Sequence, residues 1–576
     1  MGERNERPYG GRRRASSSGQ GQRRPQGDRS RGGRARSDRA PGDRPPPERD
    51  AAGRRDRLTD PVGQFHHTRP VDPAHLRSRR GWRRFGTPVL FILLLAAVAL
   101  GVQQFVIGAT DDRERFGWDE DPLSLPAPTT TAPPTTEPEV EAPASGFSTP
   151  GLLTFRGSAT RSYHGEGPVP ANPEVLWSYP GDSGGMCSES AVGAEVKTWC
   201  GTGWTGQPAV FERDGRTWVV FGAYDRKVHF LDYETGEDIL PPFETGDIIK
   251  GSVTIDPEGR PLVYSGSRDN ELHVIAIDRE VPTELWSLHA DAVSPTKWND
   301  DWDASPLVLG DVLYQGGENS QFHVVALNPS TGDDGLVQVT PELVFNAPGW
   351  DDELTAALNT RQNDVSIENS VAYADGVVYF ANSGGLVQGW DVSGVAEGAE
   401  PTRVLRYWAG DDIDASIVID DEGFLYVAVE NERGNARAAE VGQLLKLDPS
   451  QPDDPLVWSL KDPRGFWATP ALHDDVVIAP SDGGTVYAVD RETGEVRWTF
   501  ELPPPTWQSP VVVEDTLIQG DCEGGLHAYD VSDTSVAPPE LWAVELEGCI
   551  ESTPAVWQGR IFVGARGGRF YAIGDP

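Results

Sequence analysis

The stretch from Trp467 to Phe500, WATPALHDDVVIAPSDGGTVYAVDRETGEVRWTF, decides how the rest of the chain is interpreted. It contains four short apolar or alternating segments, which end at His473 or cover residues 476–479, 485–489 and 495–500. Gly and Asp residues lie between them and supply the backbone conformations that tight hairpins need. The pattern predicts a four-stranded antiparallel meander. Because one such sheet cannot bury both of its faces, we expect similar sheets on either side of it.

Similar units recur along the chain, and each begins with a small or polar residue that is often followed by proline. The starts are roughly 40 to 65 residues apart, a spacing typical of β-propeller blades and their insertions. The eight aligned starts are Gln207-Pro208, Ser252-Val253, Ser305-Pro306, Ser370-Val371, Ser416-Ile417, Thr469-Pro470, Ser509-Pro510 and Thr553-Pro554.

The eighth unit is incomplete, because the sequence stops at the end of its third strand. Its fourth strand is predicted near the start of the repeat region, where residues 174–179 match residues 495–500 almost position for position. We therefore expect an all-β, eight-bladed propeller over residues 151–576, in which the N-terminal and C-terminal strands share one blade. Such closure removes free sheet edges and joins the ring by ordinary strand pairing.

Charge divides the chain into two parts. Residues 1–85 contain 23 arginines and 10 acidic residues, so against a formal total of −39 the remainder carries −52. Their Arg, Gly, Ser and Pro content, with few apolar clusters, predicts a disordered tail. An Arg-rich tail can bind nucleic acid or anionic lipid headgroups. We expect instead a solvated cytoplasmic tail that fixes membrane topology, and not a nucleic-acid-binding segment.

Residues 86–108 include about 20 consecutive uncharged residues, the length that crosses the hydrocarbon core as a helix. Arginines precede the segment and acids follow it, which predicts a single-pass cell-membrane protein with its N-terminus in the cytoplasm and its propeller outside. A signal peptide cleaved near Ala99 is the alternative, but its basic region would be unusually long. Residues 109–150 are rich in Pro and Thr and are predicted to form an extended extracytoplasmic linker.

All four cysteines lie beyond the predicted membrane segment, where an oxidising compartment favours two disulfides. Strands alternate in direction within a blade, so the loop that enters the first strand and the hairpin between the second and third strands share one face. Cys522 lies in such a hairpin and Cys549 in the next entering loop, so we expect these two to pair across neighbouring blades. Cys187 and Cys200 then share the loop that enters the first blade. Free buried thiols are the alternative.

The segment GGTVYAVDRETGEVRW resembles the tryptophan-docking repeat of the quinoprotein, or PQQ-like, β-propeller superfamily, which includes PQQ-dependent alcohol dehydrogenases and the outer-membrane assembly factor BamB. The resemblance rests on Asp490, Thr493-Gly494 and Trp498, and it covers residues 152–576 approximately. It implies that a tryptophan of each fourth strand packs between adjacent blades. The matching positions are Trp177, Trp286, Trp458, Trp498 and Trp542, with Phe345 in place of tryptophan and no clear equivalent around Ile239.

One position of the repeat gathers polar and aromatic side chains. Two residues before each aligned start, at the entrance to the innermost strand, the chain carries Thr205, Lys250, Asp303, Glu368, Asp414, Trp467, Trp507 and Glu551. We expect these side chains to form a ring at the central mouth and interpret the ring as the candidate ligand-binding site. Asp303, Glu368 and Asp414 are candidate ligands for a hard cation such as Ca²⁺, and the tryptophans could instead hold a cationic organic group. A polar, water-filled channel is the alternative.

The longer departures from the repeat, residues 180–204, 289–302, 346–366 and 430–442, are all predicted to lie on the face of this mouth. Loops on a rigid scaffold often carry recognition residues, and exposed tryptophans are common anchors. This face is therefore predicted to bind a partner protein or a small ligand. The alternative is that the loop tryptophans cover the channel and the loop acids cap turns. The tryptophans in question are Trp199, Trp204, Trp298, Trp302 and Trp350.

A propeller fold alone does not fix an activity. PQQ-dependent alcohol dehydrogenases typically carry two adjacent cysteines over the cofactor, and no Cys-Cys pair occurs here, so PQQ is not expected. BamB is typically lipid-anchored through an N-terminal cysteine, whereas the first cysteine of this chain is Cys187. A quinoprotein-like oxidoreductase and a BamB-like envelope-assembly factor therefore stay as alternatives. The leading prediction is a membrane-anchored extracytoplasmic binding or scaffold module, and the missing cysteine pair disfavours an enzyme.

Overall fold

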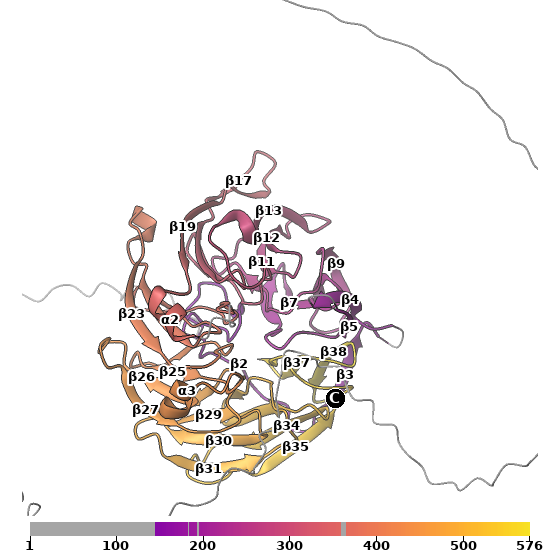
Figure 1. Cartoon of the computed structure of the whole chain (residues 1–576). Helices are drawn as coiled ribbons and strands as arrows, with labels where there is room; N and C mark the ends of the chain where they lie inside the picture. The colour runs from indigo at the N-terminus through magenta and orange to yellow at the C-terminus, as the bar shows by residue number, and fades with distance from the viewer. Residues whose placement is uncertain (1–144, 182–183, 193–194, 359–363) are drawn as a thin grey trace, which may run out of the picture. The chain divides into compact units, whose positions relative to one another are not determined.

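Eight sheets follow one another around a central axis in the computed structural model, as Figure 1 shows. The described residues are 145–181, 184–192, 195–358 and 364–576. The predicted all-β, eight-bladed propeller is confirmed. The predicted tail (1–85), the predicted membrane helix (86–108) and most of the predicted linker lie outside the described residues. Among the described residues, no helix is long and apolar enough to span a bilayer.

The stretch that suggested the fold forms the sixth blade. Its strands are β28 (Ala471–His473), β29 (Val476–Pro480), β30 (Thr485–Asp490) and β31 (Val496–Glu501), and they pair in sequence order. Where the sequence predicted a strand boundary, the observed boundary lies within about one residue of it. Asp474, in the hairpin between β28 and β29, has a φ of 44°, a left-handed conformation that Asp tolerates in tight turns.

The other blades repeat this four-stranded plan with different loop lengths. The first contains β6 (Ala209–Arg213), β7 (Arg216–Ala223), β8 (Lys227–Asp232) and β9 (Asp238–Glu244). The second contains β10 (Thr254–Ile255), β11 (Leu262–Gly266), β12 (Glu271–Ala276) and β13 (Thr283–His289). The third contains β14 (Leu307–Leu309), β15 (Val312–Gly316), β16 (Gln321–Ala326) and β19 (Glu342–Pro348), with a side hairpin of β17 (Pro329–Thr331) and β18 (Val337–Val339).

The fourth blade contains β20 (Ala372–Ala374), β21 (Val377–Phe380), β22 (Leu386–Asp391) and β23 (Thr402–Trp408). The fifth contains β24 (Val418–Ile419), β25 (Leu425–Ala428), β26 (Leu444–Leu447) and β27 (Leu456–Leu460). The seventh contains β32 (Val511–Val513), β33 (Thr516–Gly520), β34 (Gly525–Asp530) and β35 (Glu540–Glu545).

The eighth blade closes the ring as predicted. Its strands β36 (Ala555–Trp557), β37 (Arg560–Ala565) and β38 (Arg569–Gly574) come from the C-terminal end, and β3 (Glu174–Tyr179) supplies the outer strand. Trp177 of β3 lies opposite Ala572 of β38, in the same register that Trp498 has opposite Ala488 in the sixth blade. The match between residues 174–179 and 495–500 therefore reflects equivalent places in two sheets.

The fourth-strand tryptophans join successive blades. The Trp458 indole Nε1 donates to the Arg491 carbonyl oxygen of the next blade at 3.0 Å, and Trp177 does the same to Tyr233 at 3.1 Å. The turn needs glycine at position 494, because a Cβ atom there would lie 2.7 Å from the Trp458 ring. Packing between blades, as the resemblance implied, is thus confirmed for these tryptophans. Leu240 and Leu405 occupy the equivalent place in the first and fourth blades.

The small residues at the aligned starts form a hydrogen-bond ladder around the axis. The backbone N–H of one start donates to the side-chain oxygen of the next blade's start at 2.9–3.0 Å in five steps. These steps are Gln207 to Ser252, Ser305 to Ser370, Ser370 to Ser416, Ser416 to Thr469, and Thr469 to Ser509. A hydroxyl at this position satisfies a buried N–H that the short inner strand leaves without a strand partner.

A segment that sequence analysis did not interpret, residues 151–166, runs across the inner strands, and we call it the strap. It begins with β1 (Gly151–Leu152), which pairs with β6, and ends with β2 (Gly165–Glu166), which runs parallel to β36. Between them, Leu153 and Thr160 accept hydrogen bonds from backbone N–H groups of the second and fifth blades.

Two fully buried arginines let the strap reach the remaining inner strands. Arg156 donates to the carbonyl oxygens of Pro470 and Pro510, and Arg161 donates to that of Val371 at 2.9 Å. With Thr154 donating to Pro306 at 3.2 Å, the strap hydrogen bonds to all eight blades. Burial lowers the pKa of each arginine to about 9.

Candidate site at the central mouth

The strap and the predicted mouth lie at opposite ends of the inner strands. Strap contacts fall one to four residues after each aligned start, at residues such as Pro470 and Ile419, whereas the mouth residues stand two before it. The chain therefore enters the propeller on the face opposite the mouth.

The structure brings the predicted mouth residues together. Thr205 Oγ1 donates to the carbonyl oxygens of Lys250 and Asp303, and the Lys250 ammonium forms an ion pair with the Asp303 carboxylate. On the other side of the ring, the Trp467 indole Nε1 donates to Asp414 Oδ2 at 2.9 Å. Side chains from successive blades thus meet as the repeat alignment predicted, and they are buried or half-buried.

Aromatic rings fill part of the mouth. Trp204, from the loop that enters the first blade, stacks on Trp467 of the sixth blade with ring centroids 5.1 Å apart. Trp507 of the seventh blade meets Trp467 edge-on at 4.9 Å. All three side chains are buried. Because the first and sixth blades are not neighbours, Trp204 reaches across the axis.

A second row of charged residues, which sequence analysis missed, lies beside the first. It comes from the same place in the hairpin between the second and third strands, where five of the eight blades carry a charged side chain. The repeat alignment could have revealed these charged residues, because each lies at the repeat position two residues after the small residue that ends most second strands. These residues are Arg268, Glu318, Glu430, Asp482 and Arg566.

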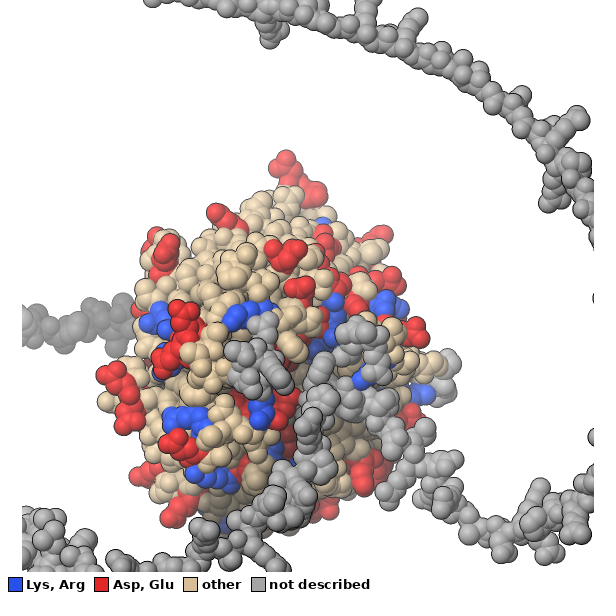
Figure 2. All heavy atoms as spheres, viewed as in Figure 1, with Lys and Arg blue, Asp and Glu red and all other residues tan. Residues whose placement is uncertain are grey.

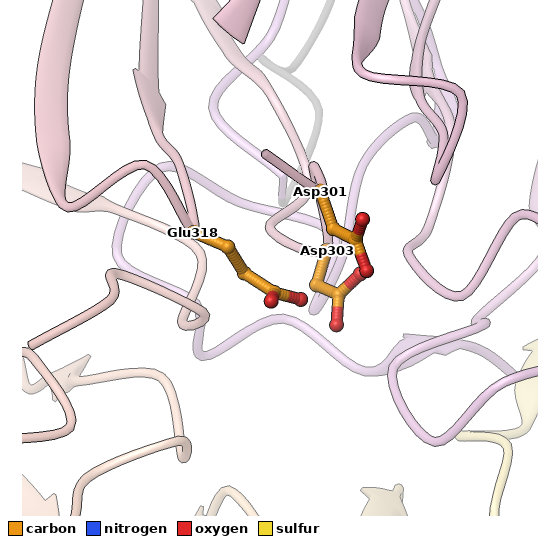
Figure 3. Close-up of side chains that lie close together, drawn as sticks. All are labelled: Asp301, Asp303 and Glu318. Atoms are coloured by element: carbon orange, nitrogen blue, oxygen red, sulfur yellow. The ribbon is translucent and has the colours of Figure 1, made fainter. Parts of the chain in front are cut away.

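In the third blade, three buried acids converge from the entering loop and the hairpin. Figure 3 shows the carboxylates of Asp301, Asp303 and Glu318 pointing toward one another. Lys250 lies 3.2 Å from Glu318 and also pairs with Asp303, and Arg268 lies 2.6 Å from Asp301. Burial raises the pKa of Asp301 to about 7. Burial also opposes the charge of Lys250, but Asp303 and Glu318 raise its pKa well above the ordinary value. Each acid in this group therefore has a cationic partner.

A second acidic group, in the fifth blade, is less well balanced. Asp412, Asp414 and Glu430 place carboxylate oxygens within 4.8 Å of one another. Arg433 contacts only Asp412 of these three, at 2.9 Å, and also pairs with Asp364. Burial is the main reason that the pKa of Asp414 rises to about 6 and that the pKa of Glu430 rises well above its ordinary value. The group concentrates more negative charge than its surroundings neutralise.

The acids proposed as cation ligands from the sequence divide between these groups. Asp303 belongs to the third-blade group and Asp414 to the fifth-blade group, while Glu368 belongs to neither and accepts a hydrogen bond from Ser366 at 2.8 Å. Glu551 pairs with Arg566 at 3.0 Å. Burial and the nearby Asp414 raise the pKa of Glu368 well above its ordinary value.

The long loops cover the face of the mouth. Both predicted disulfides are confirmed: Cys187–Cys200 links β4 (Cys187–Val192) to β5 (Glu195–Cys200), and Cys522–Cys549 joins the seventh and eighth blades. The second bond places a hairpin and an entering loop on one face, as the strand-direction argument requires. Figure 2 shows acidic side chains spread over this face with basic ones among them.

The loop tryptophans do not all face solvent. Trp199, Trp204 and Trp302 are buried, whereas Trp298 is 45% exposed. Beside Trp298, the Lys297 ammonium lies over the Trp350 ring at 4.4 Å from its centroid. Trp350 lies two residues before the start of the short helix α2 (Asp352–Ala357), which is labelled with α3 (Ala436–Val441) in Figure 1. Of these loop tryptophans, Trp298 and Trp350 are therefore the ones that stay at least partly exposed.

The repeat region matches a known protein family. The family model described as "Outer membrane protein assembly factor BamB" matches residues 174–500, 440–537 and 482–575. The outer membrane protein assembly factor BamB of Shewanella oneidensis is 33% identical over 97 residues, which cover 16% of this chain. The matched part spans only about a quarter of that relative, 24% of its length.

Solved structures resemble the chain in fold. A europium-containing methanol dehydrogenase matches with a TM-score of 0.53 and 13% identity, over 74% of this chain and 98% of that one. The quinohemoprotein alcohol dehydrogenase ADHIIG of Pseudomonas putida HK5 matches with a TM-score of 0.50 and 11% identity, over 74% of this chain and 80% of that one. At these identities the likeness concerns architecture alone.

Proposed function

The chain belongs to the PQQ-like β-propeller family whose model is described as outer membrane protein assembly factor BamB, and we propose that it is a non-catalytic binding or scaffold propeller of the extracytoplasmic space. The observation that carries the proposal is the arrangement of its two faces. The strap closes one end of the inner strands, while the long loops, two disulfides and the charged mouth gather at the other.

Two disulfides support an oxidising, extracytoplasmic location. The uncharged residues 86–108 would then tether the propeller to the membrane, with residues 109–150 as the spacer. Because the chain enters the propeller on the strap face, the mouth face is left available for a partner. The formal charge of −52 beyond residue 85 favours a basic partner surface and salt-sensitive association.

The residues at the mouth do not fit PQQ. PQQ is a flat molecule with three carboxylate groups, and the mouth presents an excess of carboxylates of its own, including Asp412, Asp414 and Glu430. Without a bound cation to offset them, like charges in a buried site repel, which costs binding free energy. The stack of Trp204 on Trp467 also occupies space across the axis. We therefore place quinone chemistry below a binding role for this chain.

The test is in-cell crosslinking from the loop face of the full chain. A photocrosslinker placed at Lys297 should capture a specific partner, and Trp298→Ala should reduce that capture at least severalfold. Leu541→Ala is the matched control, because Leu541 is 51% exposed on an outer strand away from the mouth. Equal loss in both variants, or absorbance evidence that the purified chain binds PQQ stoichiometrically, would refute the proposal.

A role in outer membrane protein assembly is the second candidate. It is favoured by the family description and by the relative from Shewanella oneidensis, whose name states that role. Removing the chain from cells should then lower the amount of folded outer membrane protein. Unchanged levels, together with a captured partner unrelated to assembly, would leave the general scaffold role standing alone.

A further inference from the structure

The acidic group of the fifth blade differs from that of the third because several of its carboxylate oxygens have neither a hydrogen-bond donor nor a cationic partner among the described residues. Asp412 uses Oδ2 for Arg433, and Asp414 uses Oδ2 for the Trp467 indole. The other oxygens, Asp412 Oδ1 and Asp414 Oδ1, accept no hydrogen bond from any group of the described chain, and neither does Glu430 Oε1. Each of the three carboxylates therefore has one oxygen without a hydrogen-bond donor, and the three side chains place carboxylate oxygens within 4.8 Å of one another.

Burial makes this arrangement costly without a counter-charge. The Asp412 and Glu430 side chains belong to residues that are each only 5% exposed, so bulk water does not solvate them freely. A buried carboxylate oxygen without a donor forfeits free energy that hydrogen bonding or ion pairing would otherwise supply. Glu430 is the strongest case, because no hydrogen bond or ion pair joins its side chain to another group of the described residues.

We propose that Asp412, Asp414 and Glu430 form a binding site for one hard divalent cation, with Ca²⁺ as the ion that fits best. Oxygen ligands at 2.3–2.6 Å from Ca²⁺ can lie up to about 5 Å apart, which accommodates three oxygens that lie within 4.8 Å of one another. Ca²⁺ also accepts carboxylate-rich cages readily, whereas Mg²⁺ usually retains several waters.

The surroundings position the ligands. Arg433 holds Oδ2 of Asp412, and Trp467 holds Oδ2 of Asp414, so these two carboxylates are oriented before an ion arrives. The third-blade group is not a second site of this kind, because Lys250 and Arg268 already form ion pairs with all three of its acids. This inference goes beyond the proposed function and does not require that the loop face bind a partner.

Terbium luminescence tests the site on the purified, chelator-treated full chain. Tb³⁺ replaces Ca²⁺ in oxygen sites, and an ion bound by Asp414 would lie close to Trp467, which is 2.9 Å from that carboxylate. We expect sensitised Tb³⁺ emission on tryptophan excitation, displaced by Ca²⁺ with an apparent Kd of about 0.1–1 mM, the range of extracellular modules. Isothermal titration should give one Ca²⁺ per chain.

Glu430→Gln keeps the shape of the side chain and should weaken Ca²⁺ binding at least about tenfold, because it removes one ligand charge. Asp301→Asn removes a charge from the third-blade group, whose acids are already ion-paired, and should change the affinity by less than about twofold. Circular dichroism in chelator checks that both variants fold. No ion binding by the parent, unchanged binding by Glu430→Gln, or an equal loss in Asp301→Asn would overturn the assignment, whatever the partner experiment gives.

Discussion

Asp414→Asn should stabilise the metal-free chain at neutral pH, although it removes a side chain from the centre of the propeller. Asp414 is half-buried, and desolvation raises its pKa from an ordinary 3.8 to about 6, with Asp364 and Glu432 adding to the rise and Trp467 and Arg433 opposing it. The folded state therefore holds this proton more tightly than the unfolded chain does. Stability is lost as pH rises from about 4 to about 6, and the loss is complete above that range.

The magnitude follows from the two pKa values. A rise from 3.8 to about 6 corresponds to about 3 kcal/mol at pH 7.5 and about half of that at pH 5, by proton linkage. Relaxation around a buried charge reduces such figures, so we expect a gain of about 1–3 kcal/mol for Asp414→Asn at pH 7.5. Asn can still accept the hydrogen bond from Trp467, which limits the structural cost of the change.

Urea denaturation in chelator, at pH 7.5 and at pH 5, measures this difference in the free energy of unfolding. Asp333→Asn is the control, because Asp333 is exposed in the turn between β17 and β18 and loses the same formal charge. A gain in Asp414→Asn that is absent from Asp333→Asn and shrinks at pH 5 supports the reasoning. A destabilised Asp414→Asn variant at pH 7.5, or an equal gain in both variants, would show that the charged Asp414 carboxylate does not destabilise the folded state as we expect.

Two further predictions concern the fold. Deleting β3 (Glu174–Tyr179) should lower the free energy of unfolding by more than about 4 kcal/mol, because the eighth blade loses its outer strand and Trp177; an unchanged urea midpoint would contradict the ring closure. Gly494→Ala should cost about 2–4 kcal/mol, because its Cβ would lie 2.7 Å from Trp458, whereas Gly423→Ala, with a φ of 86° but no atom within 4 Å, should cost about 1 kcal/mol; equal costs would mean that the tryptophan contact contributes nothing.

The fold could be predicted from the sequence because the pattern of one blade recurs eight times. Each blade offers the same alternation, turn residues and fourth-strand aromatic, so a weak local pattern gains weight from its copies. The position of Cys522 against Cys549 followed from strand direction alone. The pairing of residues 174–179 with the last blade followed from a single segment match.

The strap could not be predicted in the same way. Its residues occur once, its two strands are only two residues long, and it binds the blades mainly through carbonyl oxygens that every sequence possesses. Arg156 and Arg161 give no sign of burial in a chain so rich in arginine. A segment that contacts all blades at once has no periodicity for a repeat search to find.

The acidic groups were only half visible from the sequence. The row two residues before each start supplied Asp303 and Asp414, but pairing each with a hairpin acid requires the register of a blade in three dimensions. Glu430 is separated from Asp414 by 16 positions, and a long insertion follows it, which hid its equivalence to Glu318. Charge balance was beyond sequence analysis altogether, because it depends on which acids Lys250, Arg268 and Arg433 reach.

Residues at different heights along the central axis have different roles, some structural and some suited to binding. At the level of the aligned starts, small polar residues join neighbours by a ladder of the same hydrogen bond, and one residue further on, several backbone carbonyls accept hydrogen bonds from the strap. Both levels use groups that every blade can offer, so they close the ring without distinguishing one blade from another. Two residues before the starts, the side chain changes from Thr205 to Asp414 to Trp507. Selectivity for a ligand requires such differences between blades, and the mouth is therefore the level of the axis at which a specific ion or partner can be recognised.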